Sequence, residues 1–228
     1  MCNEACIDFA ARVLSAEEVA DRVVVEVGSY DTTGTVRPRV VAHGPASYLG
    51  VDIEPGPSVD AICDVLALER TYGRDAFDIV ISTEMVEHVR DWRGAFDNMK
   101  AVLRPGGLLV LTTRSLGFQF HFGPFDFWRY EPEDLRAIAA DMQIVALERD
   151  PISPGVFLAA RKTTAPATDL GTIELYSMIR RRRVRDVSGR QLALYEWTHP
   201  MTIARRVLPR PLRRGLKRAV QALTGWDG

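Results

Sequence analysis

Apolar runs of strand length alternate with amphipathic stretches of helix length along most of this chain. Short apolar runs bounded by turn residues predict strands, and 3.6-residue patterns predict helices. Strands are expected at residues 23–27, 48–53, 77–82, 108–113, 143–149 and 156–161, and helices at 3–14, 35–42, 92–103 and 132–142. A further short helix should follow Ser15, because Glu18 stands three residues later in capping-box spacing.

The order of these elements predicts the fold class. Strands and helices that alternate in this way are typical of an α/β protein with a doubly wound, mostly parallel sheet. Residues 150–155 join the last two strands and are too few for a crossover helix, so the last strand should run antiparallel. Ligands of such sheets bind beyond the carboxyl ends of the strands.

Charge divides the chain into two parts. The formal net charge is -1, but residues 163–228 hold twelve arginines, one lysine and five acidic residues, or +8, which leaves −9 in residues 1–162. We therefore expect a ligand-binding domain over 1–162 and a basic, partly helical C-terminal extension over 163–228. Within it, residues 212–223 form an amphipathic pattern that could contact an anionic membrane, RNA or a polysaccharide, or pack on the domain or on a homodimer mate.

The remaining composition bounds the class of protein. Hydrophobic residues make up 46% of the chain, enough for a packed core, and the longest apolar runs are only strand-sized, so no transmembrane segment is expected. Cys2, Cys6 and Cys63 are odd in number and lack metal-ligand spacing, which indicates reduced thiols. With no secretory signal at the start, these features predict a cytoplasmic protein, and the excess of arginine over lysine hints at a bacterial one.

The first strand ends in a turn that indicates a nucleoside ligand. Glu26 and Gly28 close an unbroken apolar run, and Gly34 allows close approach of the backbone. Tyr30 stands where a dinucleotide fingerprint would have its second glycine, so a pyrophosphate cradle is not expected. Asp52, 24 residues beyond Gly28, is suited to a ribose diol.

Four motifs together resemble the class I S-adenosylmethionine-dependent methyltransferases, in particular the methyltransferase type 11 group. They are Glu26-Val27-Gly28 with Gly34, Gly50-Val51-Asp52, the stretch 77–89, and the stretch 103–108. The resemblance implies a seven-stranded Rossmann-like sheet with S-adenosylmethionine as cofactor. It also implies that Glu26 and the glycine turn at Gly28 and Gly34 hold the methionine end, that Asp52 holds the ribose hydroxyls and that Asp64 holds the adenine amino group.

Three ionisable residues follow the strand expected at 77–82. Glu84, Glu87 and His88 are spaced i, i+3, i+4, which would place them near one face of a helical turn, and the loop carrying His121 should enter the same region. Glu-x-x-Glu-His with a later His is similar to the metal site of small-RNA 2′-O-methyltransferases, which implies a divalent metal such as Mg²⁺. The alternative is that these residues only cap and pack.

An aromatic loop is the candidate acceptor site. Residues 118–130 hold seven aromatic side chains, which can stack on sugars or other rings. His121 is the candidate catalytic base, with His88 and Asp126 beside it. The alternative is that the aromatic residues only cover the edge of the sheet.

These features predict an S-adenosylmethionine-dependent O-methyltransferase that acts on a hydroxyl of a saccharide or similar small molecule. Some actinobacterial enzymes that O-methylate mannose-containing polysaccharide precursors look similar in size and layout, which makes a mannoside the specific expectation for the acceptor. An RNA methyltransferase is the enzymatic alternative, and a non-catalytic module that binds the cofactor or a membrane is the alternative from another class.

Overall fold

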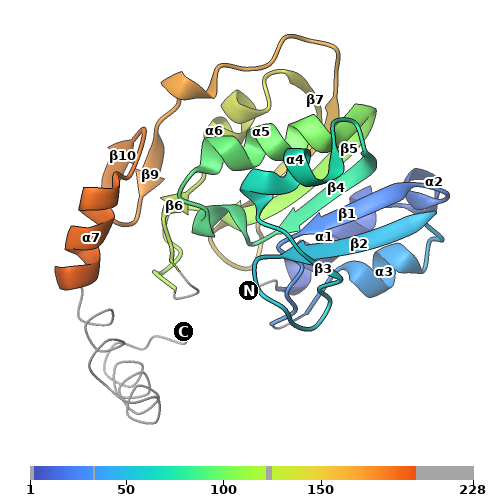
Figure 1. Ribbon diagram of the computed structural model, residues 1–228, viewed down its shortest axis with the longest axis horizontal. Coiled ribbons are helices and arrows are strands. Elements are labelled where there is room, and N and C mark those ends of the chain that lie inside the picture. Colours follow the sequence, from blue (N-terminus) through green and yellow to red (C-terminus); the bar gives the residue numbers. More distant parts are fainter. Residues whose placement is uncertain (1–2, 33, 122–124, 199–228) are drawn as a thin grey trace.

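The computed structural model describes residues 3–32, 34–121 and 125–198 and is built around a seven-stranded sheet (Figure 1). The strand order is β3-β2-β1-β4-β5-β8-β7. The strands are β1 (Val23–Val27), β2 (Ser47–Asp52), β3 (Ala61–Ile62), β4 (Phe77–Thr83), β5 (Leu103–Arg114), β7 (Met142–Arg149) and β8 (Gly155–Lys162). Strands β3, β2, β1, β4 and β5 are parallel, and β8 runs antiparallel to both β5 and β7. The predicted fold class is confirmed, including the antiparallel last strand.

Helices cover both faces of this sheet (Figure 1). One layer contains α1 (Glu4–Val13), α2 (Ala16–Val19) and α3 (Arg37–Val41), and the other contains α4 (Leu68–Tyr72), α5 (Trp92–Val102) and α6 (Pro132–Ile138). Neighbouring residues of β1 supply the two cores, because Val24 packs in one and Val25 in the other. The Ser15 cap forms as expected, with its side chain accepting a hydrogen bond from the Glu18 amide.

Two element boundaries differ from the predicted ones by four or five residues. Strand β5 begins at Leu103, five residues earlier than expected, because Leu103 already pairs with Phe77 before a register shift at Ile79. Helix α6 ends at Ile138 rather than near 142, and the Met142 amide then bonds to the Ala139 carbonyl in the turn that leads to β7.

A smaller three-stranded sheet lies beside the main one, in the order β10-β9-β6 (Figure 1). It consists of β6 (Trp128–Arg129), β9 (Leu175–Ser177) and β10 (Arg182–Val184), and α7 (Gly189–Thr198) follows it. Three 3-10 helices complete the described chain, namely η1 (Val65–Ala67), η2 (Val86–His88) and η3 (Leu170–Thr172). Strand β6 belongs to the predicted domain and β9 to the predicted extension, so the sheet joins the two parts.

Arg93 of α5 reinforces this junction. Its guanidinium donates hydrogen bonds to the carbonyls of Leu170, Ile173 and Arg185 and pairs with Asp186 at 2.8 Å. Residues 170–186 therefore pack closely on the domain. The functional division at residue 162 stays a prediction.

Several predictions concern residues outside the described ranges, the cysteines and membrane-spanning segments. The amphipathic segment 212–223 and Cys2 lie outside the described residues, as do residues 122–124 of the aromatic loop. Cys6 and Cys63 are both buried free thiols, as expected. Among the described residues, no helix is long and apolar enough to cross a membrane.

Candidate active site

The predicted cofactor residues lie at the carboxyl ends of β1, β2 and β3. Gly28 has φ +80°, and both its amide and that of Ser29 bond to the Val51 carbonyl, which folds the turn back onto β2. The half-buried Asp52 carboxylate accepts hydrogen bonds from the amides of Tyr30 (3.1 Å) and Glu54 (3.2 Å). The strand order thus brings Asp52 and the glycine turn together, as the motifs predicted.

These residues fit a nucleoside bearing a ribose diol. A carboxylate offers about four lone-pair positions, so Asp52 can accept further hydrogen bonds beyond its two amide donors. The Ser29 hydroxyl is buried and has no hydrogen-bond partner among the described residues. Asp64 is exposed after β3 and caps η1 by accepting from the Leu66 amide, and the Gly34 amide donates to Asp31 within the loop after β1.

We predict that Gly28→Ala weakens S-adenosylmethionine binding by about tenfold or more. A Cβ at this position would stand 2.5 Å from Cγ and 2.7 Å from Cβ of Met85, so Met85 and the turn must move. The affinity is measured by isothermal titration calorimetry.

Gly44→Ala is the matched control for this prediction. Gly44 also has positive φ, at +67°, but no atom lies within 4 Å of the added Cβ. It should lose only about 1–2 kcal/mol of stability through backbone strain and keep its cofactor affinity. Equal affinities for the two variants would contradict the prediction.

Glu26 lies in the middle of the sheet with its carboxylate turned toward β2. It is 2% exposed, and Oε2 accepts a 2.7 Å hydrogen bond from the Tyr48 hydroxyl. Burial raises the pKa of Glu26 to about 7, although Tyr48 and Arg37 both favour its charged form. The acid of the first motif is therefore half protonated near neutral pH.

This raised pKa makes stability depend on pH. The unfolded chain ionises Glu26 near 4.5, whereas the folded chain keeps the proton until about pH 7, so folding stability falls between these two values. We expect Glu26→Gln, which still accepts the Tyr48 hydrogen bond, to match the wild type at pH 4.5 and to exceed it by up to about 3 kcal/mol above pH 7. Urea unfolding across this pH range measures the difference, and a difference that does not change with pH would contradict it.

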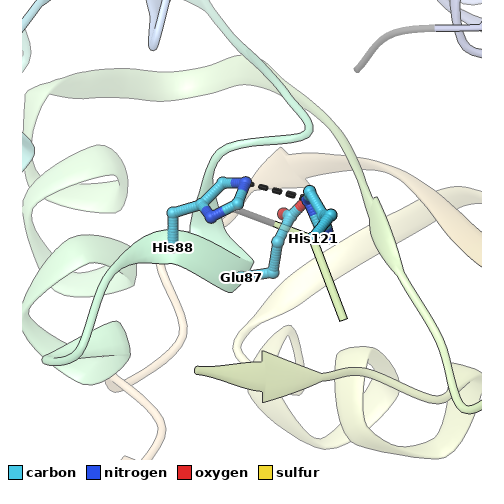
Figure 2. Close-up of side chains that lie close together, drawn as sticks. All are labelled: Glu87, His88 and His121. Atoms are coloured by element: carbon cyan, nitrogen blue, oxygen red, sulfur yellow. Dashed lines mark hydrogen bonds and ion pairs between the residues drawn. The ribbon is translucent and has the colours of Figure 1, made fainter. Parts of the chain in front are cut away.

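Glu87, His88 and His121 converge in one cluster (Figure 2). The His88 and His121 Nε2 atoms are 3.1 Å apart, and Glu87 Oε1 lies 3.9 Å and 4.0 Å from them. The Glu87 side chain is fully buried, whereas the two histidine side chains remain 16% and 12% exposed. A molecule at the surface can therefore reach the cluster through the histidines.

The group that faces the Nδ1 atom of each histidine determines which ring nitrogen carries the proton. His88 Nδ1 lies 2.5 Å from the Phe125 carbonyl, and His121 Nδ1 lies 3.1 Å from Asp126 Oδ2. The Phe125 carbonyl only accepts hydrogen bonds, so His88 Nδ1 holds a proton and the Nε2 of the neutral ring presents a lone pair to His121. His121 Nδ1 lies at ion-pair distance from the Asp126 carboxylate, although it forms no well-aligned hydrogen bond among the described residues. A proton on that nitrogen, beside the carboxylate, leaves the Nε2 lone pair of His121 facing that of His88. A shared proton or another cation is needed to satisfy both.

Charge around the cluster reinforces this arrangement. Burial lowers the pKa of His88. Burial alone would raise the pKa of Glu87, but positive charge on the neighbouring histidines, such as a proton that they share, outweighs it and holds that pKa below its usual value. Glu87 is therefore ionised beside two imidazoles.

Asp126 is fixed by a buried arginine. Arg129 donates to both Asp126 oxygens, at 2.5 Å and 2.6 Å, and neither side chain is exposed to solvent. Burial opposes ionisation, but the bonds from Arg129 and His121 bring the pKa of Asp126 down to about 2. Asp126 is thus a permanent anion behind His121.

The structure does not bring Glu84 into the cluster. Its φ of +55° ends β4 in a left-handed turn, so Glu84 and Glu87 do not share one helical turn as the spacing predicted. Its carboxylate forms a buried ion pair with Arg114 and lies 3.6 Å from the Cys6 thiol. Burial and the charge of Glu87 raise the pKa of Glu84 well above its usual value, against the effect of Arg114.

The structure divides the aromatic loop into a buried half and a partly exposed half. Phe127, Trp128 and Tyr130 are buried in the core, where Trp128 Nε1 donates to the Val89 carbonyl at 3.0 Å. Phe118 and Phe120 are half-buried, and the Phe118 ring packs edge-on against His121. Among the described residues of the loop, Phe118, Phe120 and Phe125 are the aromatic side chains that stay partly exposed.

Comparisons with known proteins agree with this fold. A family model described as a methyltransferase domain matches residues 3–143. The ubiquinone biosynthesis O-methyltransferase of Bradyrhizobium sp. (strain ORS 278) is 43% identical over 56 residues, which are 25% of this chain and 21% of that protein. The match thus spans about a fifth of that relative.

Solved structures give the same class of fold. The 1,6-didemethyltoxoflavin-N1-methyltransferase of Burkholderia thailandensis, solved with S-adenosylhomocysteine, has a TM-score of 0.54 and 20% identity over 71% of this chain and 80% of its own. The N-methyltransferase NodS of Bradyrhizobium japonicum WM9 has a TM-score of 0.53 and 17% identity over 68% and 93%. The chain belongs to the methyltransferase domain family and is a class I S-adenosylmethionine-dependent methyltransferase.

Proposed function

We propose that this methyltransferase transfers a methyl group to a hydroxyl of a saccharide or similar small molecule, with His121 as the general base. The observation that carries the proposal is the line of contacts from Arg129 through Asp126 to His121, which ends at an accessible imidazole nitrogen. The relative with O-methyltransferase activity supports an oxygen acceptor.

A hydroxyl acceptor explains why a base is needed. When bound, S-adenosylmethionine supplies an electrophilic methyl group, and the protein must orient and deprotonate the acceptor. When both rings are neutral, His121 Nε2 can take the hydroxyl proton and share it with His88 Nε2, while the Asp126 carboxylate stabilises the imidazolium that forms. Glu87 adds a second negative charge 4.0 Å from the same nitrogen.

The cofactor would be held by the residues described above. Asp52 would receive the ribose hydroxyls and the exposed Asp64 the adenine amino group, while Glu26 and the turn from Gly28 to Gly34 would border the methionine end. Glu26 is buried and partly protonated, and its carboxylate already accepts a hydrogen bond from Tyr48. It would therefore support the turn that borders the methionine end.

A divalent cation is the alternative to the shared proton between the two histidines. One ligand atom each from Glu87, His88 and His121 lie within 4.8 Å of one another. His88 Nδ1 has the Phe125 carbonyl as its outer hydrogen-bond acceptor, as metal-binding histidines usually do, and His121 Nδ1 lies 3.1 Å from the Asp126 carboxylate. Two imidazoles and one carboxylate suit zinc or manganese better than magnesium, which prefers oxygen ligands. Such an ion would lower the pKa of a bound hydroxyl.

Transfer of labelled methyl groups from S-adenosylmethionine tests the function. Saccharides, lipids and RNA are offered separately, each with and without a chelator, and we expect label in the saccharide fraction. Label confined to RNA, or label in none of the three, would contradict the proposal. Full activity in chelator with no gain from added Zn²⁺ or Mn²⁺ would exclude the cation and leave the shared proton.

A homodimer, contact of the basic extension with anionic surfaces and a cytoplasmic location remain predictions. The amphipathic segment on which the surface contact depends lies outside the described residues.

A further inference from the structure

A cavity of about 260 Å³ lies between the aromatic loop and the C-terminal segment. Its lining residues are Phe120, Tyr176, Met178, Arg181 and Tyr195. Four of these five follow residue 143, where the family match ends. The cavity is therefore built mainly by β9, the turn after it and α7, which are additions to the methyltransferase domain.

Arg181 is the charged group of this cavity. Within the described parts of the chain its guanidinium has no hydrogen bond and no carboxylate within ion-pair distance. Its backbone has φ +52°, in the turn where its amide bonds to the Ser177 carbonyl. Glycine suits that conformation better by roughly 1–2 kcal/mol on general grounds, so the turn alone does not explain an arginine.

Aromatic rings form the walls. Phe120 and Tyr195 lie with ring centroids 6.2 Å apart, and Tyr176 reaches the cavity from β9. Ligand pockets usually measure ~300–1,000 Å³, so a cavity of this size suits one ring rather than an extended polymer. Phe120 lines the cavity and the next residue, His121, belongs to the histidine cluster, so the aromatic loop contributes to both sites. Burial and the charge of Asp126, which lies beside His121, both raise the pKa of the cavity residue Tyr195.

We propose that this cavity is an acceptor subsite for a sugar ring that carries a phosphate group, with Arg181 pairing with the phosphate and the aromatic side chains packing on the ring. The inference rests on the proposed function, because it assigns the substrate class of the same site. A guanidinium binds phosphate through two parallel hydrogen bonds, and aromatic faces pack well on sugar rings. The phosphate would anchor the ring while a hydroxyl of the same ring faces His121.

Calorimetric titration of the full chain with three probes tests this subsite. The probes are mannose 6-phosphate, methyl α-mannoside and inorganic phosphate. We expect mannose 6-phosphate to bind at least about tenfold more tightly than the mannoside, since charged hydrogen bonds are the strong ones. Equal affinity for these two sugars would overturn the phosphate contact, and inorganic phosphate that binds as tightly as the sugar phosphate would overturn the ring contact.

Variants separate the Arg181 side chain from the fold of its turn. Arg181→Gln and Arg181→Gly should both abolish the preference for the phosphorylated sugar, and Arg181→Gly should be at least as stable as the wild type because glycine relieves the positive φ. Arg180→Gln, an exposed neighbour that does not line the cavity, is the matched control and should keep the preference. A preference that survives in Arg181→Gly would contradict the subsite.

The binding readout is independent of methyl transfer. If the wild type binds S-adenosylmethionine but methylates no saccharide, the proposed function fails, whatever the probes show. If it methylates saccharides and Arg181→Gly leaves both binding and turnover of the phosphorylated sugar unchanged, only the subsite fails.

Discussion

His121→Ala is expected to lower kcat by about 10²- to 10⁴-fold while the affinity for S-adenosylmethionine stays unchanged. The loss follows from removing the imidazole that Asp126 orients at 3.1 Å and that faces His88 at 3.1 Å. The residues proposed to bind the cofactor lie on other strands, at the ends of β1 and β2, so they should not respond. Turnover is measured with a saccharide acceptor under cofactor saturation, and the cofactor affinity is measured by calorimetry.

His43→Ala is the control for this substitution. His43 lies in the turn between α3 and β2, at the amino edge of the sheet, and does not belong to the cluster of Glu87, His88 and His121. Its replacement should leave kcat unchanged. Turnover of His121→Ala within a factor of about three of the wild type would reject His121 both as a base and as a metal ligand, since either role requires a larger loss.

Arg114→Met should lower the free energy of unfolding by about 3–5 kcal/mol. Arg114 is 2% exposed, pairs with Glu84 and lies 3.3 Å from Asp150, while its guanidinium packs 4.2 Å above the centre of the Phe118 ring. Methionine fills a similar volume but leaves the buried Glu84 without its cation. Urea unfolding followed by circular dichroism measures the change.

A double variant shows where this loss comes from. Asp150 keeps hydrogen bonds from Asn3 and Ser153, whereas Glu84 depends mainly on Arg114 and already has a raised pKa. Adding Glu84→Gln to Arg114→Met removes the unpaired charge and should recover most of the lost stability. If the double variant is no more stable than Arg114→Met, the uncompensated carboxylate is not the cause.

The central sheet was predictable because its strands are buried on both faces. A run of β-branched apolar residues such as 23–25 is typical of a buried central strand and fits few other elements. The order of strands and helices then determines which strand ends meet. Acidic residues placed directly after strands, such as Asp52, were therefore assigned to the site from topology alone. The same reasoning brought the His121 loop to the segment after β4.

The buried arginines were not predictable from sequence. Arg114 and Arg129 look like surface residues until the structure shows the carboxylates that pair with them. The turn at Glu84 was missed because the helical spacing of Glu84, Glu87 and His88 assumes negative φ throughout. Strands β9 and β10 have three residues each, too few to show a period. The cavity that β9 helps to form therefore had no sequence signal beyond the aromatic loop.

The atom that receives the methyl group tests the account most directly. The protein is incubated with mannose 6-phosphate, methyl α-mannoside and S-adenosylmethionine labelled with ¹³C at its methyl group, and the products are analysed by carbon NMR. We predict a new O-methyl signal on a sugar hydroxyl oxygen, absent with His121→Ala. The same signal with His121→Ala, or no transfer by a protein that binds the cofactor, would contradict it.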